Sequence, residues 1–372
     1  MYHPWPESDP AVMAPVEERE DLRAVVRKVL DRHASHEAVR AAADSTRGYS
    51  EALWRVLNDE LGVSRLAVPE ASGGHGFGVG DLVVVLEGTG AALLPEPILA
   101  SAVLGCQALI RADDPAAHSD LIEAALSGDV VVALSDTPLG VSAAPSTDGS
   151  AWTLRGTVSR VLQGEAADHL VVAADSAEGL ILVVIRAADA RREARTVLDL
   201  TRRQSGVDLE GVTGRLVVGP ARAAEVLRHL DLLKQVALAA EHTGMVASLL
   251  DLTREYVSQR TQFGRAIGSF QAVKHRLADV LVDLERARSA SRYAAAVLDE
   301  SPESAELAVA VASSVCLDAA VSAAHEAVQL HGGIGFTWEH RAHYYLRRVL
   351  GNEGLGGSSR AHRARIAELV GV

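Results

Sequence analysis

The feature that most constrains the fold of this chain is a change of residue pattern along it, from helical spacing to strand spacing and back. Between about residues 17 and 127, apolar residues recur at helical intervals, for example at Val26, Val29 and Leu30. Between about residues 129 and 219, short apolar runs such as 169–174 and 179–185 are separated by turn residues, which is typical of strands. After Pro220 the helical spacing returns in long stretches.

This pattern predicts an α+β protein with three domains. We expect a helical domain at residues 1–127, a middle β-barrel or β-sandwich domain at 128–222, and a C-terminal four-helix bundle at 223–372. A chain of 372 residues is long enough for two or three domains. In the bundle, one apolar helix face is expected from residues at helical offsets, namely Val273, Leu277, Val280, Leu281 and Leu284.

Composition excludes several classes of function. The formal net charge of -13 would repel a nucleic-acid backbone, so we expect no nucleic-acid partner. No stretch approaches the roughly 18 uninterrupted apolar residues that cross a bilayer, so we expect no membrane partner. The acidic, proline-broken segment 1–9 does not resemble a signal peptide, and the two cysteines are too few for a disulfide framework. We therefore expect a cytoplasmic protein.

Three local patterns are interpreted as structural. The glycine-rich stretch 73–80 has neither the spacing of a dinucleotide fingerprint nor that of a P-loop, so it predicts a plain connection. His331, His340 and His343 stand outside any metal-binding frame, and no metal site is expected. No Gly-x-Ser-x-Gly elbow occurs, so serine-hydrolase chemistry has no support.

Two later stretches of the sequence are more specific than these patterns. In residues 260–280 a helix ends near Arg260, a Phe-Gly turn follows, and Gln271 opens the next helix. In residues 329–339, paired glycines follow a helix and would let another molecule approach the backbone closely. Alone, the first would predict only a helix-turn-helix and the second only a helix C-cap. Both occur in this chain, in this order, and about two helices separate them.

Together these stretches resemble the two C-terminal signatures of the acyl-CoA dehydrogenase family. The helical, β, helical order covers the whole chain as that family would, and the stretches 66–70 and 199–203 agree with it. The resemblance implies an enzyme that oxidises an acyl-CoA thioester to the enoyl-CoA, using a glutamate base and FAD. It also implies that each FAD lies mostly in one subunit while its adenosine-pyrophosphate end reaches a neighbour.

The resemblance places the neighbour-facing cofactor contacts on five positions of this chain, all of which match the family pattern: Arg260, Phe263, Gln271, Gln329 and Gly333. Their residue types suit the task. A permanently charged arginine suits a pyrophosphate, phenylalanine offers an apolar face, and glycine permits close backbone contact.

The catalytic glutamate of the family has no counterpart at its usual place. Counting through the closing motif puts Gly356 there, and the alternative position on an earlier helix holds Lys234. Neither residue is expected to serve as a base, because glycine takes no proton and a protonated lysine cannot accept one. Two nearby carboxylates stay open as relocated bases, Glu241 and Glu353, each of which is otherwise a solvated or core-rim acid.

The middle domain departs from the family as well. The Trp-Ile-Thr that lies against the flavin ring in the family corresponds here to residues 160–162, which are Arg-Val-Leu. The family's Glu-Pro-x-x-Gly-Ser-Asp loop corresponds loosely to residues 135–141. We therefore expect that the residues around the flavin ring are lost in this chain, whereas those that contact the adenosine-pyrophosphate end are retained.

From this asymmetry we predict the non-catalytic subunit of an α2β2 heterotetramer, which completes the FAD site of a homologous catalytic partner. The chain resembles the smaller subunits of actinobacterial steroid side-chain dehydrogenases, which implies a steroid-CoA substrate and an electron-transfer flavoprotein or similar acceptor. Two alternatives stay open. One is a self-sufficient homotetramer that uses Glu241 or Glu353, and the other is a non-enzymatic scaffold without flavin.

Overall fold

The computed structural model describes residues 17–147 and 149–372, and the N-terminal segment 1–9 considered above lies outside them. Packing divides the chain into two compact units. Unit 1 holds the described residues up to Arg40 together with Val79–Leu94 and Gln235–Val372, and unit 2 holds Ala41–Gly78 and Pro95–Lys234. These units follow packing and cut across the order of the chain, so the domain boundaries at 127 and 222 stay predictions.

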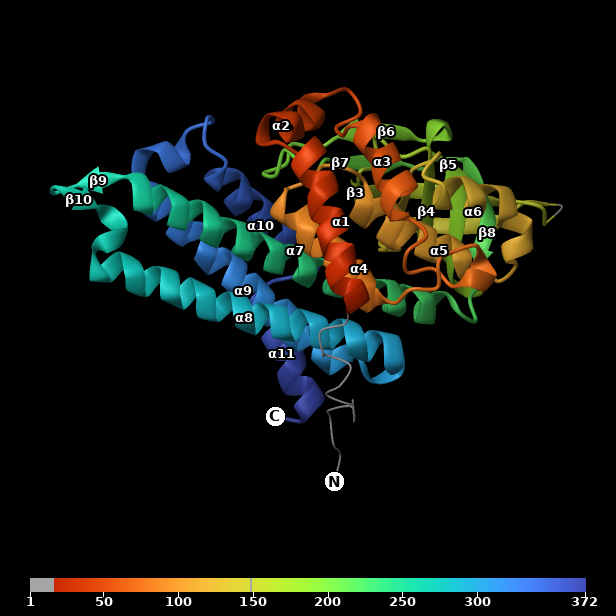
Figure 1. Ribbon diagram of the computed structural model, residues 1–372. Helices are drawn as coiled ribbons and strands as arrows, with labels where there is room; N and C mark the ends of the chain where they lie inside the picture. The colour runs from red at the N-terminus through yellow and green to blue at the C-terminus, as the bar shows by residue number, and fades with distance from the viewer. Residues whose placement is uncertain (1–16, 148) are drawn as a thin grey trace. The chain divides into compact units, whose positions relative to one another are not determined.

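Unit 1 is helical. Its elements are α1 (Glu17–His33), α4 (Val79–Ala91), most of α7 (Ala223–Gln259), α8 (Gln271–Glu300), α9 (Glu306–His331), α10 (Ala342–Gly356) and α11 (Ser359–Val370). Figure 1 shows α8 and α9 running side by side, and α10 and α11 also pack on α9. The N-terminal helices α1 and α4 pack on one another, and α4 also packs on α8.

The helix α9 forms the centre of this bundle. By length and mean hydropathy, the stretch Glu306–Phe336 qualifies as a helix that could cross a membrane. In the fold, however, 72% of its most apolar window is buried inside the protein, as expected of a core helix in a bundle. Its small side chains, mostly alanine and valine, allow neighbouring helices to approach closely.

The crossing of α4 and α7 depends on glycine. A Cβ atom added to Gly244 of α7 would lie 1.8 Å from the carbonyl oxygen of Glu87, and one added to Gly90 of α4 would lie 2.6 Å from Cα of Glu241. Only residues without a side chain let the two backbones touch in this way. The crossing therefore fixes the position of Glu241 and of the residues after it on α7.

Unit 2 contains a closed β-barrel. Its eight strands are β1 (Val132–Ser135), β2 (Val141–Pro145), β3 (Trp152–Leu162), β4 (His169–Ser176), β5 (Gly179–Arg186), β6 (Arg191–Ala194), β7 (Gln204–Asp208) and β8 (Val212–Val218). The pairing path β4–β5–β8–β3–β2 returns to β4, because β2 pairs with both β3 and β4. Fully buried aliphatic side chains lie on both faces of its sheet, since consecutive residues such as Ile181 and Leu182 of β5 point to opposite faces.

Helical segments accompany the barrel in unit 2. They are α3 (Glu51–Leu61), the π-helix η3 (Ile98–Gly105), α5 (Cys106–Ile110) and α6 (Ser119–Leu126), while α2 (His36–Asp44) spans the division between the units. Packing of η3 against β1 explains why the apolar run 131–134 is buried without alternation.

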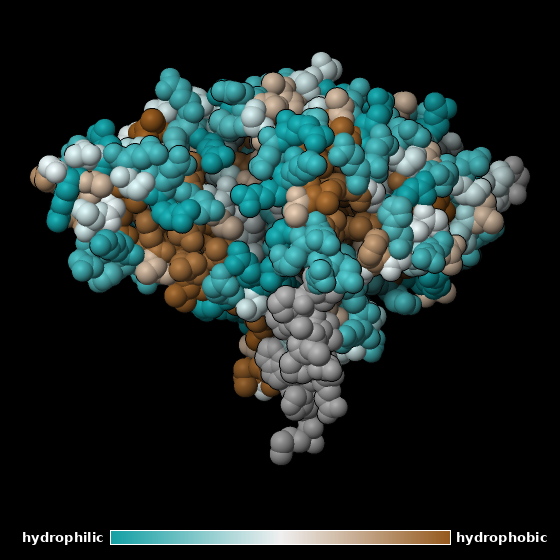
Figure 2. Space-filling view, in the orientation of Figure 1, coloured by the Kyte–Doolittle hydropathy of each residue, from teal (hydrophilic) through white to brown (hydrophobic). Residues whose placement is uncertain are grey.

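The predicted order of helices, then a β-barrel, then helices is confirmed. The glycine-rich stretch 73–80 is a connection that ends in the first turn of α4. The predicted apolar face of α8 is correct only in part. Val280 and Leu284 are buried, but Leu281 is 49% exposed and joins the exposed Val282 on the outer side of the helix. Figure 2 shows that such apolar patches interrupt a mostly hydrophilic surface.

Candidate functional site

The first signature stretch folds into a tight hairpin between α7 and α8. Arg260 follows the last residue of α7, and the two-residue strands β9 (Thr261–Gln262) and β10 (Arg265–Ala266) pair across a Phe-Gly turn. Phe263 and Gly264 both have positive φ, at 52° and 78°, as a two-residue hairpin turn of this hand requires. Phe263 is 92% exposed at the tip of the hairpin.

A left-handed phenylalanine is a costly choice for a turn. Asparagine or glycine would adopt this backbone conformation with less strain, and an exposed aromatic ring gains nothing from burial. Its contact within the chain is an edge-on approach to Phe270 at 6.2 Å between ring centroids. The ring of Phe263 therefore points into solvent and is almost uncovered by the rest of the chain.

The second signature stretch ends α9 and turns away from it. Gly332 has φ 62° and ψ −142°, a conformation that a residue with a side chain rarely adopts. A Cβ atom at Gly332 or Gly333 would meet nothing within 4 Å, so the backbone of both residues faces open space. Gln329 is exposed in the last turn of α9, just before them.

The structure brings these two stretches together. Tyr256, one turn before Arg260, stacks on His331 with 4.4 Å between ring centroids, and its hydroxyl donates a hydrogen bond to the carbonyl oxygen of His331 at 3.3 Å. His331 follows Gln329 by two residues. The ends of α7 and α9 are therefore held side by side, and Gln271 begins α8 as predicted.

All five predicted cofactor residues lie on the surface of unit 1. Arg260, Phe263, Gln271, Gln329 and Gly333 are each exposed in the isolated chain. A group of exposed donors and open backbone around one helix junction fits the adenosine-pyrophosphate end of a dinucleotide held mainly by another subunit. Their role as cofactor contacts stays a prediction.

Gly356, at the place of the usual glutamate, lies against α7. Its carbonyl oxygen accepts a hydrogen bond from Nε2 of Gln235 at 2.9 Å. A Cβ atom there would lie 2.7 Å from Cδ1 of Leu238 and 3.1 Å from Oε1 of Gln235. A glutamate at this position would therefore require both neighbouring side chains to move.

Lys234, at the alternative position, is held as a cation. Its Nζ lies 2.7 Å from a carboxylate oxygen of Asp136 and 2.9 Å from one of Asp231. Burial favours the neutral amine, but the two carboxylates outweigh it, so the pKa of Lys234 is raised. Since Asp136 belongs to the loop at 135–141, this ion pair ties the loop to α7.

The two carboxylates considered as relocated bases have different surroundings. Glu241 is 4% exposed, and its Oε2 accepts a hydrogen bond from Nδ2 of Asn352 at 3.4 Å. Asn352 also contacts Nε2 of His242 at 3.2 Å. Glu353 is half-buried on α10, where its carbonyl oxygen accepts from the amide of Gly357. Glu241 therefore has a structural partner of its own inside the bundle.

The segments 160–162 and 135–141 of unit 2, which correspond to the family's flavin-ring contacts, differ in burial and polarity. Arg160 is exposed on β3 and Val161 is buried, so neither reproduces an aromatic surface. By contrast, the Oγ atom of Ser135, at the end of β1, is buried and has no hydrogen-bond partner among the described residues. A buried polar atom without a partner in this region is compatible with a ligand.

The three late histidines lie in an aromatic cluster. His331 contacts His340 at 4.3 Å between ring centroids, and His343 contacts Trp338 at 5.0 Å and Tyr344 at 4.4 Å. In the part of the chain that the structure describes, no group of three or more His, Cys, Asp or Glu side chains is placed to hold a metal ion.

Comparison with known proteins places the chain in a family. Residues 16–129 match the family pattern "Acyl-CoA dehydrogenase, N-terminal domain", and residues 233–371 match "Acyl-CoA dehydrogenase, C-terminal domain". The chain is 37% identical over 358 residues to the acyl-CoA dehydrogenase IpdE2 of Mycobacterium tuberculosis, with 96% of this chain and 99% of that protein covered.

Solved structures agree. The ChsE4-ChsE5 complex from Mycobacterium tuberculosis contains a chain with a TM-score of 0.87 and 30% identity, covering 96% of this chain and 98% of that one. A point variant of the Tcur3481-Tcur3483 steroid ACAD gives a TM-score of 0.84 and 29% identity, covering 95% of this chain and 98% of that one. With both terminal domains matched and the fold shared along its length, this chain belongs to the acyl-CoA dehydrogenase family.

Proposed function

We propose that this chain is the non-catalytic subunit of a heteromeric acyl-CoA dehydrogenase, in which it completes the FAD site of a homologous catalytic partner. In the complex, FAD would supply the oxidising group for α,β-desaturation of an acyl-CoA thioester. This chain would bind the adenosine-pyrophosphate end through Arg260, the hairpin tip and the backbone at Gly333. The base and the ring pocket would belong to the partner.

One contrast within the chain carries this proposal. The adenosine-side residues are exposed and surround backbone with open space beside it, at Gly332 and Gly333. The place of the glutamate is instead a glycine packed against Leu238, and the alternative place is a lysine paired with two carboxylates. A chain that had lost flavin altogether would have no reason to keep the first set.

Similar proteins support a heteromeric assembly. Two of the similar solved structures are described as pairs of chains, ChsE4-ChsE5 and Tcur3481-Tcur3483, and the second is described as a steroid ACAD. We extend this to a steroid side-chain CoA as substrate and an α2β2 tetramer. An electron-transfer flavoprotein or a similar protein would then take the electrons.

Two other functions compete with this one. A self-sufficient homotetramer would need Glu241 or Glu353 as base, but Glu241 is already bonded to Asn352 inside the bundle. A scaffold without flavin would leave the strained, exposed Phe263 without a purpose. Neither alternative is supported by a specific observation of comparable weight.

The test is cofactor content. The chain is purified alone, and also after co-expression with a homologous dehydrogenase that has the glutamate. Because the ring-side contacts are incomplete here, we expect the chain alone to be nearly colourless. The mixed complex should carry one FAD for each pair of chains, measured by flavin absorbance against protein concentration.

A yellow homo-oligomer that is fully loaded with FAD and oxidises acyl-CoA by itself would contradict the proposal and favour the homotetramer. A stable mixed complex without any flavin would favour the scaffold instead.

A further inference from the structure

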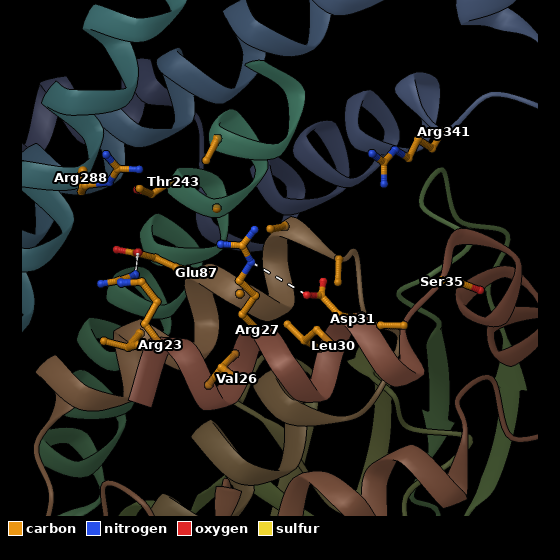
Figure 3. A pocket seen from close by; sticks show the side chains of 17 residues that line it. Arg23, Val26, Arg27, Leu30, Asp31, Ser35, Glu87, Thr243, Arg288 and Arg341 are labelled. Atoms are coloured by element: carbon orange, nitrogen blue, oxygen red, sulfur yellow. Dashed lines mark hydrogen bonds and ion pairs between the residues drawn. The ribbon is translucent and has the colours of Figure 1, made fainter. Parts of the chain in front are cut away.

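Unit 1 contains a cavity that the proposed function does not use. Its volume is about 490 Å³, within the range of about 300–1,000 Å³ that is usual for small-molecule sites. Residues of α1, α4, α7 and α8 line it, together with Arg341 just before α10 (Figure 3). None of the five predicted FAD contacts and neither candidate base is among the lining residues.

The floor of the cavity is apolar and is kept open by small residues. Val26 and Leu30 of α1 and Val84 of α4 supply the larger side chains, and all three are buried. Ala91 and Ala247, from α4 and α7, leave the volume unfilled because their side chains are a single methyl group. Such a floor favours the apolar body of a ligand over water.

The charges around this floor are unbalanced. Four arginines and two acids line the cavity, namely Arg23, Arg27, Arg288 and Arg341 against Asp31 and Glu87, and Arg288 also pairs with Glu285 outside the lining. Glu87 is already neutralised, since its carboxylate lies 2.7 Å from Arg23 and 3.5 Å from Arg292. Figure 3 shows the Arg23–Glu87 pair side by side at one end of the cavity.

One of the arginines, Arg341, has no counter-charge within the part of the chain that the structure describes. Arg27, by contrast, pairs with Asp31 at 3.9 Å, and its side chain is 83% exposed to solvent. Arg341 makes no side-chain hydrogen bond or ion pair with any residue that the structure describes, although it is only partly exposed. A guanidinium group in such a position gains most from an added carboxylate, which it binds through two parallel hydrogen bonds.

We infer that this cavity is an accessory binding site for an amphipathic carboxylate, whose apolar body lies on the α1–α4–α7 floor and whose charged group faces Arg341. Charge complementarity selects an anion, and the apolar floor selects against a small inorganic one. The site is formed by unit 1 alone, so it requires neither FAD nor a catalytic partner. Its success or failure is therefore independent of the proposed function.

The experiment is isothermal titration calorimetry on the full-length chain with three probes. Sodium decanoate has both the charge and the apolar body, decanol has the apolar body alone, and sodium acetate has the charge alone. We expect saturable binding of decanoate, much weaker binding of decanol and none of acetate. Equal binding of decanol, or the absence of saturable decanoate binding, would overturn the inference.

Variants locate the site. Arg341→Ala removes a charged hydrogen-bond donor and should weaken decanoate binding about tenfold or more. Ala247→Leu fills the floor and should weaken decanoate binding with the charges intact. The matched control is Arg254→Ala, an arginine on α7 that is 73% exposed and pairs with Asp251 outside the cavity.

Circular dichroism and thermal melting must first show that each variant is folded. If folded Arg341→Ala and Ala247→Leu proteins bind decanoate as the unaltered chain does, the ligand lies elsewhere and the inference is wrong. The same conclusion follows if Arg254→Ala weakens binding as much as Arg341→Ala.

Discussion

At the scale of single residues, Phe263 is energetically unfavourable in the isolated chain, whereas the residues at the places of the catalytic glutamate are well accommodated. Phe263 holds a left-handed backbone while its side chain is almost fully exposed, which is unfavourable unless another molecule covers it. Gly356 and Lys234 show the opposite, because each is well accommodated within the chain and each is unsuited to proton abstraction. The residues that face outward are therefore the ones to test.

The first prediction concerns Arg260. In the mixed complex, Arg260→Ala should weaken FAD binding by about ten- to a hundred-fold, because a charge-assisted hydrogen bond is worth roughly 1.5–3 kcal/mol. Excess FAD should restore most of the activity, since the substitution leaves the partner's base untouched. Flavin fluorescence during FAD titration measures the affinity.

Arg254→Ala is the control for this variant as well. Arg265 is less suitable, because its guanidinium lies 4.0 Å from the ring centroid of Phe270 and therefore supports the hairpin itself. Unchanged FAD affinity in the Arg260→Ala complex would mean that this chain does not contribute to the partner's cofactor site.

A second prediction concerns the acids. Glu241→Gln and Glu353→Gln should each leave turnover of the mixed complex within a few-fold of the unaltered one, because loss of a positioned base costs about 10²–10⁴-fold. Steady-state rates with acyl-CoA are the measurement. A collapse of turnover in either variant, with FAD content and assembly intact, would identify the base in this chain.

At the scale of elements, unit 1 depends on close contact between α4 and α7. Arg348, fully buried on α10, donates hydrogen bonds to the carbonyl oxygens of Leu93 and Leu94, and Tyr345 donates to that of Ala91. These donors satisfy the last carbonyl groups after α4, which no helix hydrogen bond reaches. Contacts with both α10 and α7 therefore fix the C-terminal half of α4.

The crossing gives a stability prediction. Gly244→Ala should lower the free energy of unfolding by at least about 1–3 kcal/mol, because the added methyl group overlaps the Glu87 carbonyl and forces the helices apart. Urea denaturation followed by circular dichroism measures the change. Ser322→Ala, an exposed position on α9, serves as the control and should change it by less than about 0.5 kcal/mol. An equally small change for Gly244→Ala would show that the backbones are not in contact in solution.

At the scale of the whole molecule, stability depends on pH through the histidine cluster. Burial, the imidazole of His331 and the guanidinium of Arg341 lower the pKa of His340 from 6.5 to about 4. Between these values the unfolded chain binds a proton that the folded chain does not. The free energy of unfolding therefore falls as the pH falls from 6.5 towards 4 and is unaffected by this group above 6.5.

The corresponding prediction compares two pH values. Lowering the pH from 7 to 5 should cost the unaltered chain on the order of 1 kcal/mol more than it costs His340→Gln, after allowance for solvent screening. Urea midpoints and slopes at both pH values give the difference. An identical pH dependence in the two proteins would show that His340 is not held neutral by the fold.

The sequence by itself determined the order of helices, barrel and helices, because hydrophobic periodicity is a local property that each segment carries alone. It also located Gln271 as the first residue of α8 and Gly332 as the residue that ends α9, since helix ends depend on the residues beside them. The sequence also showed that glycine stands at position 356, where the family resemblance places the catalytic glutamate. This needed only the count of residues along the closing motif and no knowledge of packing.

Tertiary structure alone decided the rest, because it depends on which distant residues meet. Leu281 has helical spacing with Val280 and Leu284 yet faces outward, since a helix face is buried only where a neighbour covers it. The stacking of Tyr256 on His331 and the bond from Asn352 to Glu241 join residues far apart in sequence. The cavity at Arg341 has no motif at all, because α1, α4, α7 and α8 each contribute only a few of its residues and folding brings them together.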